Sequence, residues 1–227
     1  FGGESLGYYE GFAVFVPMGV PGDKVEVEII SLKKTYGRGL ITKLIEASVD
    51  RIANHNLVSF EDFNGCDFGM LKYNKQVFYK TEMTKDVLGK IGNLNDYELF
   101  PTMGAENPYN YRNKIIEPFS RINGEIITGF FKKKSHEVFE VSENWLQDKE
   151  MEDVLKYLKF ELNKDKTWTV YDEKSHKGLL RHIMLRKNSK NELMFVLVIN
   201  GKISENLKKL ILNVTDKFES IKSVYVS

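Results

Sequence analysis

The chain has 227 residues, of which 42% are hydrophobic and 29% charged, and its formal net charge is +1. This composition suits one large or two small globular domains and excludes global disorder. With so small a net charge, binding to a polyanion would have to come from local clusters of cations.

Residues 1–47 are predicted to form a small all-β domain. Lys24–Ile30 alternates polar and apolar residues, the pattern of a half-buried strand. Val20–Asp23 carries the Pro and Gly that a tight turn requires. Two further short strands are expected at Ala13–Val16 and Gly39–Ile45. Short strands with Gly-rich turns predict an OB-like barrel, N-terminally truncated because the chain starts at Phe1 without a Met.

A helix is predicted over residues 72–91, with Gly92 as its stop signal. Its apolar residues cover a wide surface rather than one narrow stripe. Two interpretations stay open: the surface packs within its own domain, or the helix is a docking element for a further domain. Residues 93–110, which contain Pro101, Gly104 and Pro108, are expected to form a connecting loop.

The remainder, within a second domain over residues 48–227, is predicted to combine hairpins with two amphipathic helices. Asn123-Gly124 between two extended runs is a strong hairpin signal. The helices are expected at Asp148–Asn163 and at Ser204–Phe218, with Ser204 as N-cap. Strands are expected at Tyr111–Phe119, Glu125–Phe131, Val138–Val141, Trp168–Tyr171, Leu180–Lys187, Leu193–Asn200 and Val224–Val226. The fold class is therefore α+β, with an all-β barrel followed by an α/β domain.

The run Gly129–Val138 contains two phenylalanines, three consecutive lysines, Ser135 and His136. Three adjacent lysines cannot be buried, so the run must present cations at a surface. The three lysines end the segment Tyr111–Lys134, which contains six cationic and two acidic side chains and so has a local charge of +4. One interpretation is a solvated turn; the other is nucleic-acid contact, since cations beside aromatic rings suit phosphates and bases.

Two Ser-His pairs, Ser135-His136 and Ser175-His176, do not predict a hydrolase. Neighbouring residues of a strand point to opposite faces, so neither pair is a nucleophile with its base. The chain also lacks a Gly-rich phosphate loop and a His pair at helical metal spacing.

Several short segments, taken in order, resemble one known family. The first segments look like a TRAM domain: Phe1–Gly7, Phe15–Pro17, Pro21–Asp23 and Lys33–Tyr36. The later segments are Cys66–Phe68, Leu71–Tyr73, Tyr111–Lys114, Gly129–Val138, Gln147-Asp148 and Gly178–Arg186. Together they resemble the RNA (uracil-5-)-methyltransferases that act on ribosomal or transfer RNA. The resemblance implies an enzyme that transfers a methyl group from S-adenosylmethionine to C5 of a uracil, forming 5-methyluridine.

The chain departs from this family at two points. Many members hold an iron–sulfur cluster with four cysteines, but here only Cys66 matches, and Leu57, Phe63 and Asn144 stand at the other positions. One thiolate cannot hold a cluster, so we expect neither cluster nor other metal, and Cys66 as a small buried hydrophobe. The resemblance implies that the family's C-terminal domain, which binds S-adenosylmethionine and carries the catalytic residues, would follow these residues, and we expect it to be absent from this chain. We therefore expect no catalytic and no cofactor-binding residue in this chain.

The resemblance and the charges together predict an RNA-binding role. The candidate RNA-binding residues are Lys33, Lys34, Tyr36, Arg38, Arg112, Lys114, Lys132, Lys133, Lys134, His136 and Arg181. Arg112 and Lys114 are expected on one strand face, with pairing to acids such as Glu117 as the alternative. Two other functions stay open: a stand-alone, non-catalytic RNA-binding protein, and a protein-interaction module with an incidental basic surface.

The expected surroundings are cytoplasmic. One cysteine excludes a disulfide framework, no signal peptide is visible, and no apolar run approaches the roughly 20 residues that cross a bilayer. We expect RNA as the partner, no membrane contact and no obligate protein partner.

Overall fold

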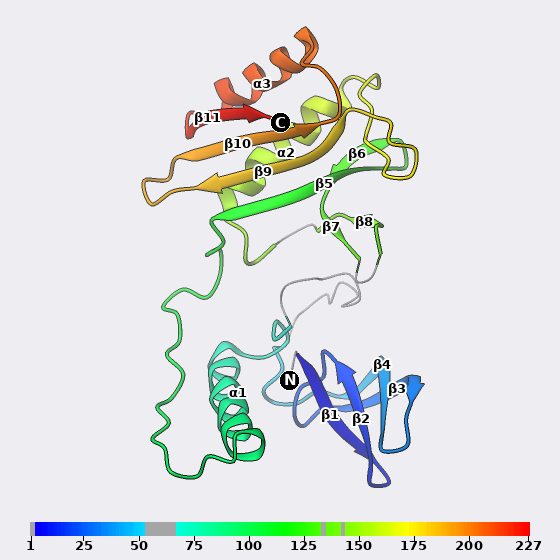
Figure 1. The fold of residues 1–227 in the computed structure, drawn as a ribbon, viewed down its shortest axis with the longest axis vertical. Helices are drawn as coiled ribbons and strands as arrows, with labels where there is room; N and C mark the ends of the chain where they lie inside the picture. The colour runs from blue at the N-terminus through cyan, green and yellow to red at the C-terminus, as the bar shows by residue number, and fades with distance from the viewer. Residues whose placement is uncertain (1–2, 53–66, 133–134, 142–143) are drawn as a thin grey trace. The chain divides into compact units, whose positions relative to one another are not determined.

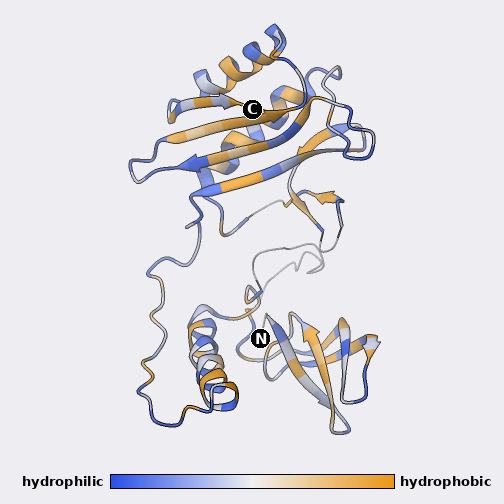
Figure 2. Cartoon of the chain, viewed as in Figure 1, coloured by the Kyte–Doolittle hydropathy of each residue, from blue (hydrophilic) through white to orange (hydrophobic). Residues whose placement is uncertain are grey.

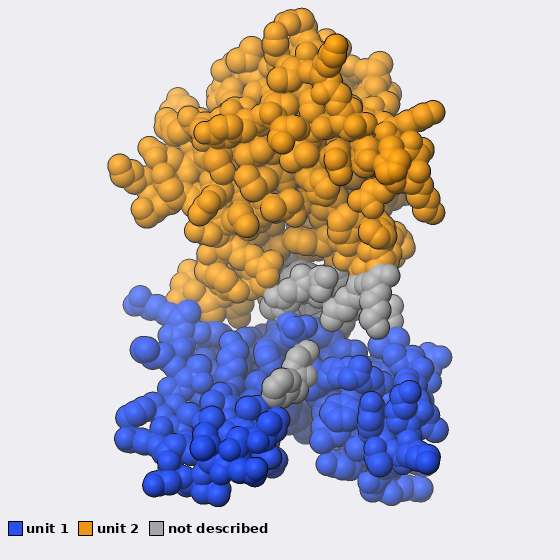
Figure 3. Space-filling model, in the orientation of Figure 1, with its two compact units in different colours: residues 1–60, 64–106 blue, residues 61–63, 107–227 orange. Residues whose placement is uncertain are grey.

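The computed structural model describes residues 3–52, 67–132, 135–141 and 144–227. They divide into two compact units, one of residues 1–60 and 64–106 and one of residues 61–63 and 107–227 (Figure 3). Within the described part of the chain, no helix is long and apolar enough to cross a membrane.

The first unit contains the predicted all-β region, confirmed as a four-stranded sheet (Figure 1). Its strands are β1 (Glu4–Tyr9), β2 (Phe12–Pro17), β3 (Lys24–Leu32) and β4 (Tyr36–Glu46), in the order β1-β2-β4-β3. The β2–β4 pair is parallel and the other pairs are antiparallel. Glu10 and Gly11, both with positive φ, join β1 to β2, as a two-residue hairpin turn of type I′ requires.

A buried ion pair closes the predicted turn at Val20–Asp23. The side chains of Asp23 and Arg51 are only 3% and 7% exposed, and Arg51 Nη2 lies 2.5 Å from Asp23 Oδ2. The carboxylate also accepts hydrogen bonds from the backbone N–H groups of Val20 and Ser48, at 2.7 and 2.9 Å. Burial alone would raise the pKa of Asp23, but these hydrogen bonds and the Arg51 charge hold it below its usual value.

The predicted helix is confirmed as α1 (Tyr73–Asp86) followed by a π-helical turn, η1 (Val87–Ile91). No residue of α1 is fully buried. The Tyr79 side chain of α1 packs against a small cluster formed by Met18, Val20, Met70 and Leu71. The loop that follows is tied back to the helix, because the Thr81 hydroxyl donates to that of Thr102 at 2.8 Å.

The second unit is a five-stranded sheet with two helices. Its strands are β5 (Lys114–Ile122), β6 (Glu125–Thr128), β9 (Leu180–Lys187), β10 (Leu193–Ile199) and β11 (Ile221–Val226), in the order β11-β10-β9-β5-β6. Only the β10–β11 pair is parallel. A separate two-stranded sheet joins β7 (Phe130–Phe131) to β8 (Val138–Phe139). The predicted hairpin at Asn123-Gly124 is confirmed, with positive φ at both residues.

Both predicted helices are present with side-chain caps. Asp148 Oδ1 accepts from the N–H groups of Glu150 and Met151 at the start of α2 (Lys149–Asn163). Ser204 Oγ accepts from Leu207 N at the start of α3 (Glu205–Lys217), as predicted. The predicted strand Trp168–Tyr171 is wrong, because only Val170 forms an isolated bridge, to Leu180, before the chain enters a tight loop.

The core of the second unit lies between one face of the sheet and these helices. Inward residues of β5, β9 and β10 pack in one cluster with apolar residues of α2 and α3, and the sheet contributes Ile115, Phe119, Leu180, Ile183, Leu185, Leu193, Phe195 and Leu197. Strand alternation therefore turns every second residue of these strands to the opposite face of the sheet.

We predict that Arg51→Met destabilises the chain by about 3–5 kcal/mol, because it leaves the Asp23 carboxylate buried without its partner. Since the native pKa of Asp23 is lowered, its contribution is complete above the unfolded pKa of about 3.9 and is lost as pH falls through the native value. Urea unfolding at several pH values measures both effects. Lys24→Met is the control, since the Lys24–Glu46 pair is 66% and 70% exposed and contributes at most about 1 kcal/mol. Equal losses in the two variants would contradict the assignment.

Candidate nucleic-acid interface

Lys132, the first residue of the lysine run, directly follows β7 in the β7–β8 hairpin. The residue before β7 is Gly129, and glycine is required there because a Cβ would lie 1.9 Å from the Phe139 carbonyl oxygen. Lys132 N–H donates to the Glu137 carbonyl at 2.9 Å, and Lys132 Nζ lies 2.8 Å from the Glu137 carboxylate. Lys133 and Lys134 lie outside the described residues. The described part of the hairpin thus holds Lys132 in a short turn, with His136 85% exposed.

A loop far away in sequence meets this hairpin. His136 Nδ1 lies 3.1 Å from Glu173 Oε2, and Glu173 belongs to the tight loop 171–178. At the ends of that loop, the Arg181 guanidinium lies over the Tyr171 ring, 4.4 Å from its centroid. The structure therefore joins the hairpin to the loop through His136 and Glu173, and Arg181 packs on Tyr171 at the ends of that loop.

The loop 171–178 is firmly held. Asn200 Nδ2 donates to the carbonyls of His176 and Gly178 at 3.3 and 3.1 Å, and the Tyr171 hydroxyl bonds to His176 Nδ1 at 2.9 Å. Gly178 has φ +102°, and a Cβ there would lie 2.0 Å from the Val170 carbonyl oxygen. A held loop presents Tyr171 and Arg181 in one arrangement, which lowers the entropic cost of binding a partner.

The side chains of the two Ser-His pairs take part in contacts of the hairpin and the loop, and they do not form a hydrolytic site. Ser135 Oγ accepts from the Glu137 N–H at 2.8 Å, while His136 faces Glu173. Among the described residues, no group of three or more His, Cys, Asp or Glu side chains could hold a metal ion.

Sequence reasoning missed Tyr171 and Glu173. Tyr171 was predicted to end a strand, and Glu173 is one of several acids on a polar loop. No local pattern distinguishes them, because their role comes from contacts with residues 10 to 37 positions away: Arg181 and His136.

The candidates of the first unit surround the turn between β3 and β4. Lys33 and Lys34 are exposed, and Lys33 N–H donates to the Tyr36 carbonyl at 2.8 Å. The Tyr36 ring is partly buried and packs edge-on against Phe15, with centroids 5.6 Å apart. Arg38 is half exposed, and its Nη2 lies 3.3 Å from Glu4 Oε2. The two lysines are therefore the freer cations of this group.

Arg112 and Lys114 do not share one regular strand. Arg112 precedes β5 and forms an isolated bridge with Gln147, while its N–H donates to the Leu146 carbonyl at 2.8 Å. Lys114 begins β5, is exposed and lies opposite Arg186. The alternative pairing of Lys114 with Glu117 is wrong, because Glu117 is turned to the opposite, buried face.

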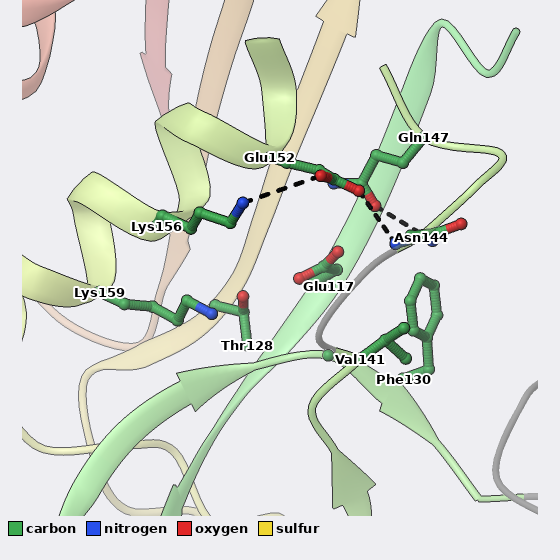
Figure 4. Close-up of a pocket in the computed structure, with 10 residues that line it drawn as sticks. Glu117, Thr128, Phe130, Val141, Asn144, Gln147, Glu152, Lys156 and Lys159 are labelled. Carbon is green, nitrogen blue, oxygen red and sulfur yellow. Dashed lines mark hydrogen bonds and ion pairs between the residues drawn. The ribbon is translucent and has the colours of Figure 1, made fainter. Parts of the chain in front are cut away.

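A small polar cavity of about 40 Å³ lies where the β7–β8 hairpin leaves the sheet (Figure 4). Its walls include Glu117, Thr128, Gly129, Phe130, Asn144, Gln147 and Lys159. Asn144 stands at the position of the family's last cluster cysteine. Its Nδ2 donates to Gln147 Oε1 at 3.2 Å, and its Oδ1 accepts from Leu146 N at 3.1 Å. Leu57, Phe63 and Cys66, the chain's single cysteine, lie outside the described residues, so the expected absence of an iron–sulfur cluster stays a prediction from the sequence.

Glu117 is the buried acid of this cavity, with 4% exposure. Burial raises the pKa of its carboxyl, and the Thr128 and Gln147 side chains and the Lys159 charge oppose that rise without cancelling it. Within the described chain, Thr128 Oγ1 is buried without a hydrogen bond of normal geometry. On β9, burial and the Arg181 charge lower the pKa of His182, so that this imidazole adds no cation at pH 7.

We predict that Glu117→Gln becomes more stable relative to the wild type as pH rises from about 4 to 8. A carboxyl with a raised native pKa contributes stability below its unfolded pKa and loses it as pH rises through the native value. Thermal unfolding of both proteins across this range measures the difference. Glu125→Gln, at an exposed position of β6, is the matched control. A stability difference between Glu117→Gln and wild type that does not change with pH would contradict the prediction.

Known proteins similar to this chain include RNA methyltransferases. Residues 1–42 match the TRAM domain family. The chain is 58% identical over 228 residues to an uncharacterized RNA methyltransferase of Fusobacterium nucleatum, covering 100% of this chain and 49% of that protein. It is 33% identical to an uncharacterized RNA methyltransferase of Halalkalibacterium halodurans, covering 98% of this chain and 48% of that protein.

A solved structure shares the fold. It is the tRNA (uracil-54, C5)-methyltransferase of Pyrococcus abyssi in complex with S-adenosyl-L-homocysteine, with a TM-score of 0.59 and 23% identity. The match covers 88% of this chain and 46% of that one. The α+β class predicted from the sequence is thus confirmed. The chain spans about half the length of these relatives, and the similarity to the two RNA methyltransferases extends over nearly all of its own length.

Proposed function

We propose that this chain is the RNA-binding portion of an S-adenosylmethionine-dependent RNA (uracil-5-)-methyltransferase that forms 5-methyluridine in ribosomal or transfer RNA. The relatives are named RNA methyltransferases, and the structural neighbour acts on uracil C5 of tRNA. Its bound S-adenosyl-L-homocysteine supports S-adenosylmethionine as the methyl donor. We assign the cofactor site and the catalytic residues to the part of the relatives' length that this chain does not span.

The observation that carries the proposal is the meeting of the β7–β8 hairpin with the loop 171–178. Cations on the hairpin suit phosphates, and the Tyr171–Arg181 stack offers planar groups to an unstacked base. A target uracil must leave its stack to be methylated, so neighbouring bases need such supports. The residues of this unit proposed to contact RNA are Arg112, Lys114, Lys132, Lys133, Lys134, His136 and Arg181, to which we add Tyr171.

The same proposal includes the domain organisation. We assign residues 1–47 to the TRAM domain, whose Lys33, Lys34, Tyr36 and Arg38 contact RNA, and residues 48–227 to a central domain. We keep helix 72–91 as a docking element, supported by the 51% exposure of Phe78 and the 70% exposure of Ile91. We place the protein in the cytoplasm, where its RNA substrates are.

A stand-alone RNA-binding protein is the alternative. The reading frame of the gene separates the two: a frame that continues into a Gly-rich loop and a later cysteine supports the methyltransferase. A frame that stops after Ser227 supports the alternative.

We predict that the 227-residue chain binds single-stranded RNA with a steep salt dependence set partly by Lys132, Lys133 and Lys134. Each neutralised phosphate contributes about 0.7 log units of affinity per log unit of salt. Alanine at all three positions therefore lowers the slope by up to about 2, measured by fluorescence anisotropy from 50 to 300 mM KCl. Alanine at the exposed α3 lysines Lys208, Lys209 and Lys217 removes the same charge and leaves the slope unchanged. Equal changes in both variants would contradict a specific role of the hairpin, and a flat response of the wild type would favour a protein-interaction module.

We also predict that the purified 227-residue chain transfers no methyl group. Tritiated S-adenosylmethionine and unmodified RNA are the substrates, and the longer protein is the positive control. Labelled 5-methyluridine is expected only with the longer protein. Incorporation by the 227-residue chain would show that this chain contains a methyl-transfer site, contrary to the proposal.

A further inference from the structure

One face of the five-stranded sheet in the second unit carries neither α2 nor α3. Strand pairing in register places alternate residues of β5, β9, β10 and β11 side by side on this face. Its middle is apolar and consists of Ile116, Met184, Met194, Val196, Val198 and Tyr225. Ile116 is 50% exposed and Tyr225 is 56% exposed, and the other four are only partly buried. We call these six residues the open face.

Strand β10 has the composition of a strand covered on both sides. Leu193–Ile199 contains no polar residue, and Figure 2 shows it as one of the most hydrophobic strands of the sheet. Strands with one solvated face alternate between apolar and polar residues, whereas strands buried on both faces are continuously apolar. The inward residues Leu193, Phe195 and Leu197 are at most 1% exposed, so the first cover is complete. The outward residues Met194, Val196 and Val198 match the composition expected beneath a second cover.

The chemistry of the open face favours a protein cover over RNA. Sheets that bind single-stranded RNA place several aromatic rings on the exposed face, where bases stack. Here five of the six residues are aliphatic or Met, and Tyr225 is the one aromatic ring. Among the described residues of this face, Lys114 and Arg186 lie opposite each other at one end, beside Met194, and His182 lies opposite Val198 and Pro118 toward the other. Contiguous exposed apolar residues with a polar rim are typical of surfaces that pack against protein.

We propose that the open face is the packing surface for the half of the longer protein that this chain does not include. The inference rests on the proposed function, because it takes the chain to be part of a protein of the relatives' length. The relatives have about as many residues again as this chain spans, since the match covers 49% of the Fusobacterium protein. A sheet covered on both faces would fix the RNA-binding hairpin relative to the catalytic half. That coupling would set the distance between the bound RNA and the reacting base.

Thiol labelling tests the proposal with a matched pair of positions. Cys66 is the only cysteine of the 227-residue chain, so C66S removes the thiol of this part. Because the longer protein is expected to carry a further cysteine, labelling is quantified by mass spectrometry on the peptide that contains each introduced thiol. I116C places a thiol on the open face, and L212C places one on the solvent side of α3, where Leu212 is 58% exposed. Rates of reaction with a maleimide are measured in the longer protein and in the 227-residue chain. We expect I116C to react at least tenfold more slowly than L212C in the longer protein, and at a similar rate in the 227-residue chain.

Each other outcome overturns the proposal. Equal rates in the longer protein mean that the face stays open. Protection that appears only when single-stranded RNA is added assigns the face to RNA. Protection of the 227-residue chain that grows with its concentration assigns it to a second copy, and protection independent of concentration assigns it to the first unit.

Two further measurements keep the result interpretable. If the 227-residue chain does not fold, labelling of the longer protein before and after unfolding in urea still compares the two positions. Methyl transfer measured on the same longer protein separates this inference from the proposed function. Active protein with a reactive I116C refutes the packing alone, whereas protected I116C without methyl transfer refutes the function alone.

Discussion

Burial of one sheet face under α2 and α3 is the constraint on which the rest of the second unit depends. Leu180, Ile183 and Leu185 anchor β9 in that core, at 0% exposure. This anchoring fixes where β9 begins, and therefore where Arg181 meets the Tyr171 ring. The same core holds β5 and β6, from which the β7–β8 hairpin leaves. Contact between hairpin and loop thus follows from how apolar side chains pack, although the residues in contact are polar.

Ion pairs with neighbouring carboxylates then determine which cationic side chains stay available to bind RNA. Lys187, for example, is tied to Asp148 and Glu150 at 3.0 and 3.2 Å at the start of α2, so it serves the fold. Lys33 and Lys34 stand exposed on their turn. The chain is almost neutral overall, yet the balancing acids are used largely in local pairs. A nearly neutral protein can in this way present basic surfaces where an RNA is expected to bind.

Local patterns predicted local structure well. The turns at Val20–Asp23 and Asn123-Gly124, the cap at Ser204 and the positions of the three predicted helices follow from backbone chemistry that acts over a few residues. Trp168–Tyr171 is not a strand because it pairs only through the isolated bridge of Val170 to Leu180, before a loop that Asn200 holds by two hydrogen bonds. No sequence pattern near Tyr171 predicts the hydrogen bonds that Asn200 makes to this loop. The pairing of His136 with Glu173 and the burial of Glu117 are likewise products of tertiary packing, which short-range patterns do not encode.

Photocrosslinking tests the central claim, that the hairpin and the loop 171–178 form one RNA-binding surface, most directly. RNA containing 4-thiouridine is irradiated with the 227-residue chain, and the crosslinked peptides are identified by mass spectrometry. The account predicts crosslinks in peptides from both Phe130–Phe139 and Tyr171–Arg181, competed by unlabelled RNA. Crosslinks confined to α3 and other surfaces outside these two segments would contradict it.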